Sequence, residues 1–141
     1  MRVEVFHSIP PQASAIRQKV FIEEQGFARE FDEIDLTAVH FLLYDDAKQP
    51  IATCRVFPDA NQSTYFLGRL AVMKEFRGTN MGAFIVRKAE EYVKENGGSE
   101  IQLHAQCRVQ GFYEKIGYSA FGSVEDEEGC PHIWMKKSLS L

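Results

Sequence analysis

The stretch from Tyr65 to Gly82, YFLGRLAVMKEFRGTNMG, constrains the fold of this chain more than any other. Its first half alternates and then becomes continuously apolar, which predicts a buried strand. Its second half places glycine and asparagine where the backbone must turn sharply. Helical periodicity follows, so the turn lies at a helix N-terminus, where free N–H groups and the helix dipole favour an anion. These residues alone predict either a phosphate-binding turn or a plain strand-to-helix connection.

Length and composition favour one ordinary globular domain. The 141 residues suffice for a core of their own, and we expect a single domain over 1–141. No apolar run reaches the roughly 20 residues that span a membrane, and the N-terminus is not typical of a signal peptide. We therefore expect a cytoplasmic protein that does not bind membranes. The net charge of −4 argues against nucleic acid as a partner.

The cysteines Cys54, Cys107 and Cys130 are odd in number and form no CxxC pair. They predict reduced thiols and no zinc site or disulfide framework.

Hydrophobic periodicity predicts a definite order of elements. We expect strands at 2–7, 39–44, 50–57, 64–73, 100–106, 118–124 and 131–137, and helices at 12–24, 83–96 and 107–116. Three consecutive strands form an antiparallel meander before the chain alternates between helix and strand. This order predicts an α/β (α+β) fold with a mixed, mainly antiparallel twisted sheet of about six to seven strands flanked by about four helices.

Two segments carry polar side chains where a site is expected. The strand at 100–106 has Gln102, His104 and Gln106 on one face, which predicts that this face lines a cleft. The segment 27–38 crowds Glu30, Asp32, Glu33 and Asp35 together. This acidic run is either a solvated loop with a short helical turn or a negatively lined entrance for a cationic acceptor.

Two separated motifs resemble those of the GNAT superfamily of N-acetyltransferases. The strand LAV followed by RGTNMG is similar to the acetyl-CoA-binding motif Q/R-x-x-G-x-G/A, and QCRVQGFYEKIGY at 106–118 is similar to the signature N-x-x-A-x-x-F-Y-x-K-x-G-F. VFIEEQ at 20–25, DLTAVH at 35–40 and PHIWM at 131–135 are similar to the small bacterial ElaA-like subgroup. The resemblance spans essentially the whole chain and implies a GNAT-like fold.

The chain departs from the GNAT motifs at two positions. Asn80 replaces the middle glycine, but asparagine enters left-handed torsions easily, so we expect the turn to survive. Gln106 replaces an asparagine and is one methylene longer, which puts the usual contact of that residue in question.

The resemblance implies acetyl-CoA as cosubstrate, bound where the meander and the following strand splay apart. Backbone groups of Leu70 and Val72 would pair with the pantetheine arm, and the turn would hold the pyrophosphate with Arg77 at its rim. The implied cofactor-binding residues are Leu70, Ala71, Val72, Arg77, Gly78, Thr79, Asn80, Met81, Gly82, Ala83, Gln106, Phe112 and Tyr113.

The resemblance also implies catalytic roles. The Val72 N–H would donate to the thioester oxygen, and Tyr113 matches the family's general acid. The strand before the turn has no carboxylate, so the general base stays open among His104, Glu24 and Asp35, the last paired with Glu33. The chemistry requires no metal.

The function expected from this resemblance is acetyl-CoA-dependent N-acetylation of a primary amine, carried by a small molecule or a protein, by direct transfer in a ternary complex. The alternative is a non-catalytic CoA or acetyl-CoA sensor or accessory module, suggested by Asn80, Gln106 and the missing carboxylate. A third hypothesis is a nucleotide or phosphate-ligand binder. Cys107 leaves an acetyl-enzyme route open, and Phe121 and Trp134, in core or interface, leave a homodimer open.

Overall fold

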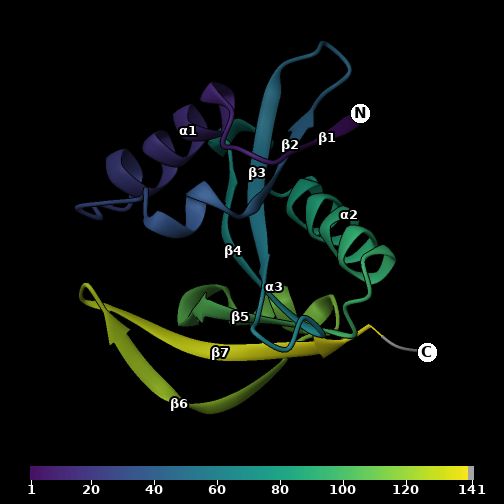
Figure 1. The fold of residues 1–141 in the computed structure, drawn as a ribbon. Coiled ribbons are helices and arrows are strands. Elements are labelled where there is room, and N and C mark those ends of the chain that lie inside the picture. The colour runs from purple at the N-terminus through teal and green to yellow at the C-terminus, as the bar shows by residue number, and fades with distance from the viewer. Residues whose placement is uncertain (140–141) are drawn as a thin grey trace.

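Seven strands form one open sheet in the order β1-β2-β3-β4-β5-β7-β6 (Figure 1). The computed structural model describes residues 1–139, so the last two residues of the expected domain lie outside the described part. The strands are β1 (Arg2–Phe6), β2 (Val39–Tyr44), β3 (Pro50–Pro58), β4 (Thr64–Val72), β5 (Glu100–Gln106), β6 (Ser119–Glu127) and β7 (Cys130–Ser138). Only β4 and β5 pair in parallel. The expected mixed, mainly antiparallel sheet is confirmed.

Helices cover both faces of the sheet. They are α1 (Pro11–Arg17), continued by a π-helical segment (Gln18–Glu24), α2 (Met81–Glu95) and α3 (Gln110–Lys115), with short 3-10 turns at Glu33–Leu36, Lys74–Phe76 and Cys107–Val109. The structure thus has three α-helices where about four helices were expected. None of the helices within residues 1–139 is long and apolar enough to cross a membrane.

Strand β2 is buried on both faces, which explains why its sequence is apolar except for the buried His40. Phe41 and Leu43 belong to the core beneath α2, whereas Leu42 and Tyr44 pack in a second core beneath α1. Figure 1 shows α1 and α2 on opposite sides of β3. The centre of the sheet is therefore held between two separate apolar layers.

Strands β4 and β5 separate soon after they begin to pair. Their parallel pairing is limited to residues 64–66 against 100–102. Strand β4 then bulges, because Arg55 pairs with Gly68 while Thr53 pairs with Ala71, and Arg69 adopts a left-handed φ of 51°. A bulge bends and twists its strand, and Figure 1 shows β5 and β7 crossing the direction of β4. The carboxyl ends of β4 and β5 therefore stand apart.

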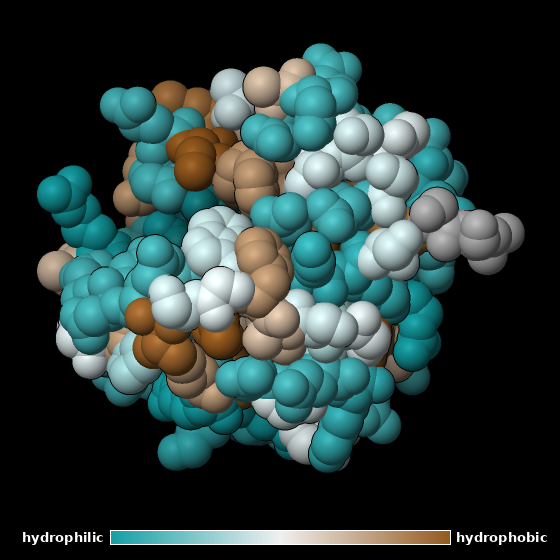
Figure 2. Space-filling view, turned by 90° about the horizontal axis from the view of Figure 1, so that it is seen from below, coloured by the Kyte–Doolittle hydropathy of each residue, from teal (hydrophilic) through white to brown (hydrophobic). Residues whose placement is uncertain are grey.

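Seen from below, the surface is largely hydrophilic, and its hydrophobic residues gather in small patches (Figure 2). Trp134, one of the two residues considered for an interface, is half-buried and lies against Phe66 and His104. Phe121 is also half-buried, beneath the ammonium group of Lys136. The homodimer stays a prediction.

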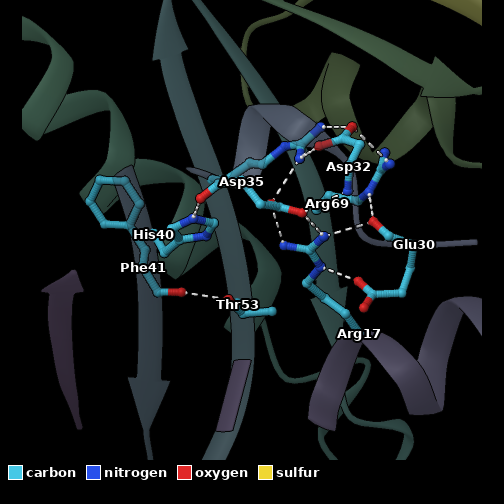
Figure 3. A network of polar contacts seen from close by, with 9 residues as sticks. Arg17, Glu30, Asp32, Asp35, His40, Phe41, Thr53 and Arg69 are labelled. Atoms are coloured by element: carbon cyan, nitrogen blue, oxygen red, sulfur yellow. Dashed lines mark hydrogen bonds and ion pairs between the residues drawn. The ribbon is translucent and has the colours of Figure 1, made fainter. Parts of the chain in front are cut away.

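Three arginines and three acidic residues form an ion-pair network beside β3 (Figure 3). This arginine–carboxylate cluster consists of Arg17, Glu30, Asp32, Asp35, Arg55 and Arg69. Asp35 is 1% exposed and accepts hydrogen bonds from Nη1 and Nη2 of Arg17 and from Nη1 of Arg55, each at 2.8 Å. Asp32 bridges Arg55 and Arg69. Every charge of the cluster therefore has an opposite partner.

The arginine–carboxylate cluster corrects the interpretation of the acidic run at 27–38 in part. The expected short helical turn is present at Glu33–Leu36, and Glu33 is exposed. The run is not a negatively lined entrance, because Glu30, Asp32 and Asp35 are neutralised by arginines from α1, β3 and β4. Asp35 Oδ2 also accepts from the Asp32 amide at 3.0 Å, which caps the 3-10 turn at Glu33–Leu36. The cluster thereby fixes this segment to the sheet.

Burial opposes ionisation of Asp35, but hydrogen bonds from Arg17, the Asp32 amide and Arg55 outweigh it and hold its pKa well below the ordinary range. We predict that Asp35→Asn lowers the free energy of unfolding by roughly 3–5 kcal/mol, because two buried arginines lose their shared charge. Urea denaturation at neutral pH measures this loss. Glu95→Gln on the exposed end of α2 is the control and should change stability by less than about 0.5 kcal/mol.

The effect of Asp35→Asn should depend on pH. A carboxylate with a lowered folded pKa contributes its full stability above the unfolded pKa of about 4 and loses it as the pH falls through the folded pKa. The difference between wild type and Asp35→Asn should therefore shrink below about pH 4. A constant difference down to the acid transition would show that the charge of Asp35 is not what stabilises the fold.

Candidate functional site

A cavity of about 850 Å³ opens where β4 and β5 separate. Its walls come from the π-helical segment, the loop at 27–30, β3, β4, the turn before α2, β5, α3 and the tip of the β6–β7 hairpin. The Ala28 amide donates to Glu128 Oε1 at 3.3 Å, so the loop and the hairpin tip meet at the rim. Of the expected cofactor residues, all except Thr79 and Ala83 line this cavity.

The edge of β4 presents unpaired backbone groups to the cavity. The Met73 amide donates to the Ile51 carbonyl at 2.8 Å, and Ala71 pairs with Thr53. Because peptide groups alternate along a strand, the groups of Leu70 and Val72 point away from β3 and toward the gap. Arg77 Nε donates to the Val72 carbonyl at 2.9 Å, so that carbonyl is occupied. The N–H groups of Leu70 and Val72 remain available on this edge.

The turn before α2 adopts the torsions expected of a tight cradle. Gly78 has φ 80°, and Asn80 has φ 65° and ψ 16°, so the expectation that asparagine takes the left-handed conformation is confirmed. Helix α2 begins directly afterwards, and the amides of its first turn have no partner within the helix. A Cβ on Gly82 would lie 3.2 Å from Phe112 Cζ, so this glycine permits the start of α2 to pack on α3.

Tyr113 lies at the inner end of the cavity and is 7% exposed. Its ring makes edge contacts with Phe112 and Tyr118 at 5.0 and 5.8 Å between centroids. Burial, and to a smaller extent the neighbouring Cys54 thiol, raises the pKa of Tyr113 well above its ordinary value. The phenol is therefore protonated throughout the neutral range.

Gln106, at the end of β5, uses its amide within the protein. Its Nε2 donates to Gln25 Oε1 at 2.9 Å, and its Oε1 accepts from Arg108 Nε at 2.8 Å. These contacts link β5 to the segment that follows α1. The longer side chain thus has partners that the motif did not predict.

Two candidates for the general base lie outside the cavity wall and are paired with arginines. Asp35 is enclosed in the arginine–carboxylate cluster and does not line the cavity. Glu24 is also absent from the cavity wall and makes a bidentate ion pair with Arg77. Each carboxylate oxygen lies 2.8 Å from a terminal guanidinium nitrogen. The hydrogen bond from Arg77 lowers the pKa of Glu24, although burial opposes it. Neither carboxylate is placed to take a proton from a ligand in the cavity.

His104, the remaining candidate, does line the cavity. Its ring stacks on Trp134 at 4.7 Å and lies 4.9 Å from the ring of His132. Nδ1 lies 3.3 Å from Glu127 Oε2. Nε2 lies 3.2 Å from Glu125 Oε1, but the angle does not make a hydrogen bond, and this buried nitrogen has no partner. The expectation that the polar face of β5 lines a cleft is confirmed for His104 and Gln106.

Several cavity residues were not singled out as site residues from the sequence. They include Phe57, Phe66, Arg55, Arg69 and Glu127. Phe66 contacts Phe57 and Trp134 at 5.3 and 5.9 Å between centroids and so forms an aromatic wall. Arg55 interrupts an apolar strand sequence, and this break in the pattern was the available signal.

Comparison with known proteins agrees with this geometry. Residues 9–139 match the family model described as acetyltransferase (GNAT) domain. The YyaT protein of Bacillus subtilis is 38% identical over 134 residues, covering 92% of this chain and 88% of YyaT.

Two solved structures share the fold. A protein from Lactobacillus plantarum matches with a TM-score of 0.88 at 31% identity, covering 99% of this chain and 100% of that one. Escherichia coli ElaA matches with a TM-score of 0.84 at 24% identity, covering 96% and 98% of the respective chains. The chain belongs to the GNAT acetyltransferase family, whose members are acyltransferases, and the resemblance drawn from the two motifs is confirmed.

The left-handed conformation of Asn80 can be tested by the effect of substitutions on stability. Asn80 makes no side-chain cap hydrogen bond, so Asn80→Gly should leave stability nearly unchanged. Asn80→Val should lower the free energy of unfolding by roughly 1–2 kcal/mol, because a β-branched residue is strained at positive φ. Urea denaturation of the two variants measures the difference. Equal stability would mean that the turn relaxes to another conformation.

Proposed function

We propose that this chain is an acetyl-CoA-dependent N-acetyltransferase that acetylates a primary amine by direct transfer. The observation that carries this proposal is the continuity of one cavity, which joins the turn before α2, the free edge of β4, Tyr113 and the aromatic wall. A two-substrate transfer requires that both reactants reach one place and lie in register. Residues of both GNAT motifs line this cavity.

The residues present fit acetyl-CoA. The N–H groups on the β4 edge suit an extended amide-bearing arm, and the left-handed residues Gly78 and Asn80 bring backbone amides together at the start of α2 for a diphosphate. The holding residues proposed are those named from the motif, with Thr79 and Ala83 contributing backbone only. When bound, acetyl-CoA would supply an activated acyl group as a thioester.

The protein's own groups have separate tasks in this proposal. The Val72 N–H would stabilise negative charge on the thioester oxygen. Tyr113 holds a proton that it can donate to a thiolate leaving group. His104 accepts a proton from the acceptor ammonium, with Glu127 as the carboxylate beside its Nδ1.

Direct transfer is supported by where the cysteines lie. Cys107 is not part of the cavity wall. Cys54 is buried, and burial raises the pKa of its thiol well above the ordinary value, so its nucleophilic thiolate form is suppressed. An acetyl-enzyme on either thiol is therefore disfavoured. Acetylation of Cys107 after incubation with acetyl-CoA alone, detected by mass spectrometry, would contradict direct transfer.

A CoA-binding sensor without turnover is the second candidate. It is favoured by Arg77, which is committed to Glu24 and the Val72 carbonyl rather than free for a phosphate. In this candidate the ligand rearranges that contact and no amine is acetylated. Turnover separates the two candidates.

We predict that Tyr113→Phe lowers kcat by roughly 10² or more, because the variant lacks the proton donor. Release of free CoA thiol from acetyl-CoA is followed with a panel of primary amines. The affinity for CoA, measured by isothermal titration, should stay within a few-fold of wild type.

The outcomes separate the hypotheses. Tyr118→Phe is the matched control, since its hydroxyl donates to Glu90 and Tyr118 does not line the cavity. Binding of CoA without thiol release for any amine would favour the sensor. Equal affinity for ADP and CoA would favour a nucleotide binder, and the absence of CoA binding would refute the cofactor site.

A further inference from the structure

Two buried side-chain polar atoms within residues 1–139 lack a hydrogen-bond partner, and both belong to residues that line the cavity. They are Arg55 Nε and His104 Nε2. Buried polar groups are nearly always satisfied, because an unpaired one costs about 1–3 kcal/mol. His104 Nε2 lies 3.2 Å from the Glu125 carboxylate, so Arg55 Nε is the atom for which a ligand would supply the partner.

The arginine end of the cavity has donors to spare. Arg69 is about one-third exposed; its Nε donates to the Glu30 carbonyl at 2.8 Å and its Nη2 to Asp32 at 3.2 Å. No described residue accepts from Nη1 of Arg69. Arg55 uses both terminal nitrogens on Asp32 and Asp35 and leaves Nε unpaired. Both guanidinium groups are thus fixed by the cluster while each keeps a free donor.

The charges of the cluster balance, so it is the free N–H donors of Arg55 and Arg69 that favour an anion at this end. Burial and the neighbouring charge of Arg55 lower the pKa of Arg69, although Asp32 and Asp35 oppose this shift. The carboxylates of the cluster are already shared among three arginines. A carboxylate from a ligand would relieve the repulsion between Arg55 and Arg69. It would also accept hydrogen bonds from the guanidinium groups, whose planar shape suits a carboxylate.

Gly68 leaves space in front of Arg55. Its φ is not in the left-handed region, so the backbone does not require glycine here. A Cβ at this position would lie 3.8 Å from Arg55 Nε and would meet nothing else within 4 Å. The missing side chain therefore affects the cavity beside Nε rather than the fold of β4.

His104 lines the same cavity from the other separating strand. Phe66 and Gln102 form the last parallel pair, so Gly68 and His104 each lie two residues beyond it on the separating strands. Glu127 flanks the His104 ring, and an acceptor ammonium would find the imidazole and this carboxylate on one side. An anion site on β3 and β4 and an amine site on β5 and β6 thus line the same cavity.

On the basis of the proposed acetyltransferase function, we infer that the acceptor is a small amino-acid-type zwitterion. Its carboxylate is bound by Arg69 Nη1 beside Arg55 Nε, and its amine lies on the side of His104 and Glu127. Its apolar part rests on the aromatic wall of Phe57 and Phe66. Polyamines and aminoglycosides are disfavoured, because they carry no carboxylate to accept from the free N–H groups of Arg55 and Arg69.

The acceptor class is tested with wild-type protein, acetyl-CoA and L-amino acids, each compared with its carboxamide and with the corresponding amine that lacks the carboxyl group. We expect kcat/KM for at least one amino acid to exceed that of both analogues by roughly 10² or more, because the analogues leave buried donors unpaired. Isothermal titration of the amino acid into CoA-bound protein gives a second readout. Equal or better turnover of carboxyl-free amines would overturn the inference and leave the acetyltransferase function intact.

Variants locate the carboxylate. Arg69→Gln should raise KM for the amino acid at least roughly 10-fold with a smaller change in kcat, and should not change KM for the carboxyl-free amine. Gly68→Ala, which the structure accommodates, should raise KM for the amino acid in the same direction. Arg87→Gln, which removes one positive charge at an exposed position of α2, is the control. It should not change KM for the amino acid or for the carboxyl-free amine.

Two further outcomes also test the acceptor inference. If Arg69→Gln is unstable, Gly68→Ala alone must show the selective rise in KM, and its absence refutes the carboxylate site. If CoA binds but no amine or amino acid is acetylated, the proposed function fails, and the acceptor inference fails with it.

Discussion

The buried ion pair between Arg17 and Asp35 is the interaction on which the arrangement of the site depends. It joins α1 to the 3-10 turn at Glu33–Leu36, and Arg55 extends it to β3. A buried pair gains little over apolar packing, but losing one partner leaves a costly unpaired charge. The interaction therefore specifies geometry: the segment at 27–32 can lie over the cavity only where its carboxylates meet all three arginines.

The separation of β4 and β5 converts this scaffold into a site. In a continuous sheet the N–H groups of Leu70 and Val72 would be paired with a neighbouring strand. The pairing of β4 with β5 ends after three residues, and the bulge at Arg69 follows, so this edge stays free for a ligand. The bulged residue Arg69 lines the cavity together with Arg55. The separation of the strands thus gives the unpaired edge, and the bulge contributes an arginine to the cavity wall.

Local patterns in the sequence predicted much of the fold and, within the site, the turn before α2 and Tyr113. Alternation and helical spacing identified the seven strands and the helices, and the two motifs predicted the turn before α2 and the position of Tyr113. The insertion of β7 between β5 and β6 was not predicted, because strand order depends on contacts distant in sequence. The burial of Arg17 was not predicted either, although its spacing indicates it. Arg17 lies on the apolar face of its helix, three residues before Val20 and four after Ala13.

The acidic end of β6 has a consequence for the solubility of the protein. Strand β6 is the outer edge of the sheet, and a free edge can pair with a strand of another molecule. Glu125, Asp126 and Glu127 follow one another on this strand, after an irregularity in its pairing with β7. Charge and irregularity both oppose edge-to-edge addition. The carboxylates that flank His104 therefore also protect the sheet against aggregation.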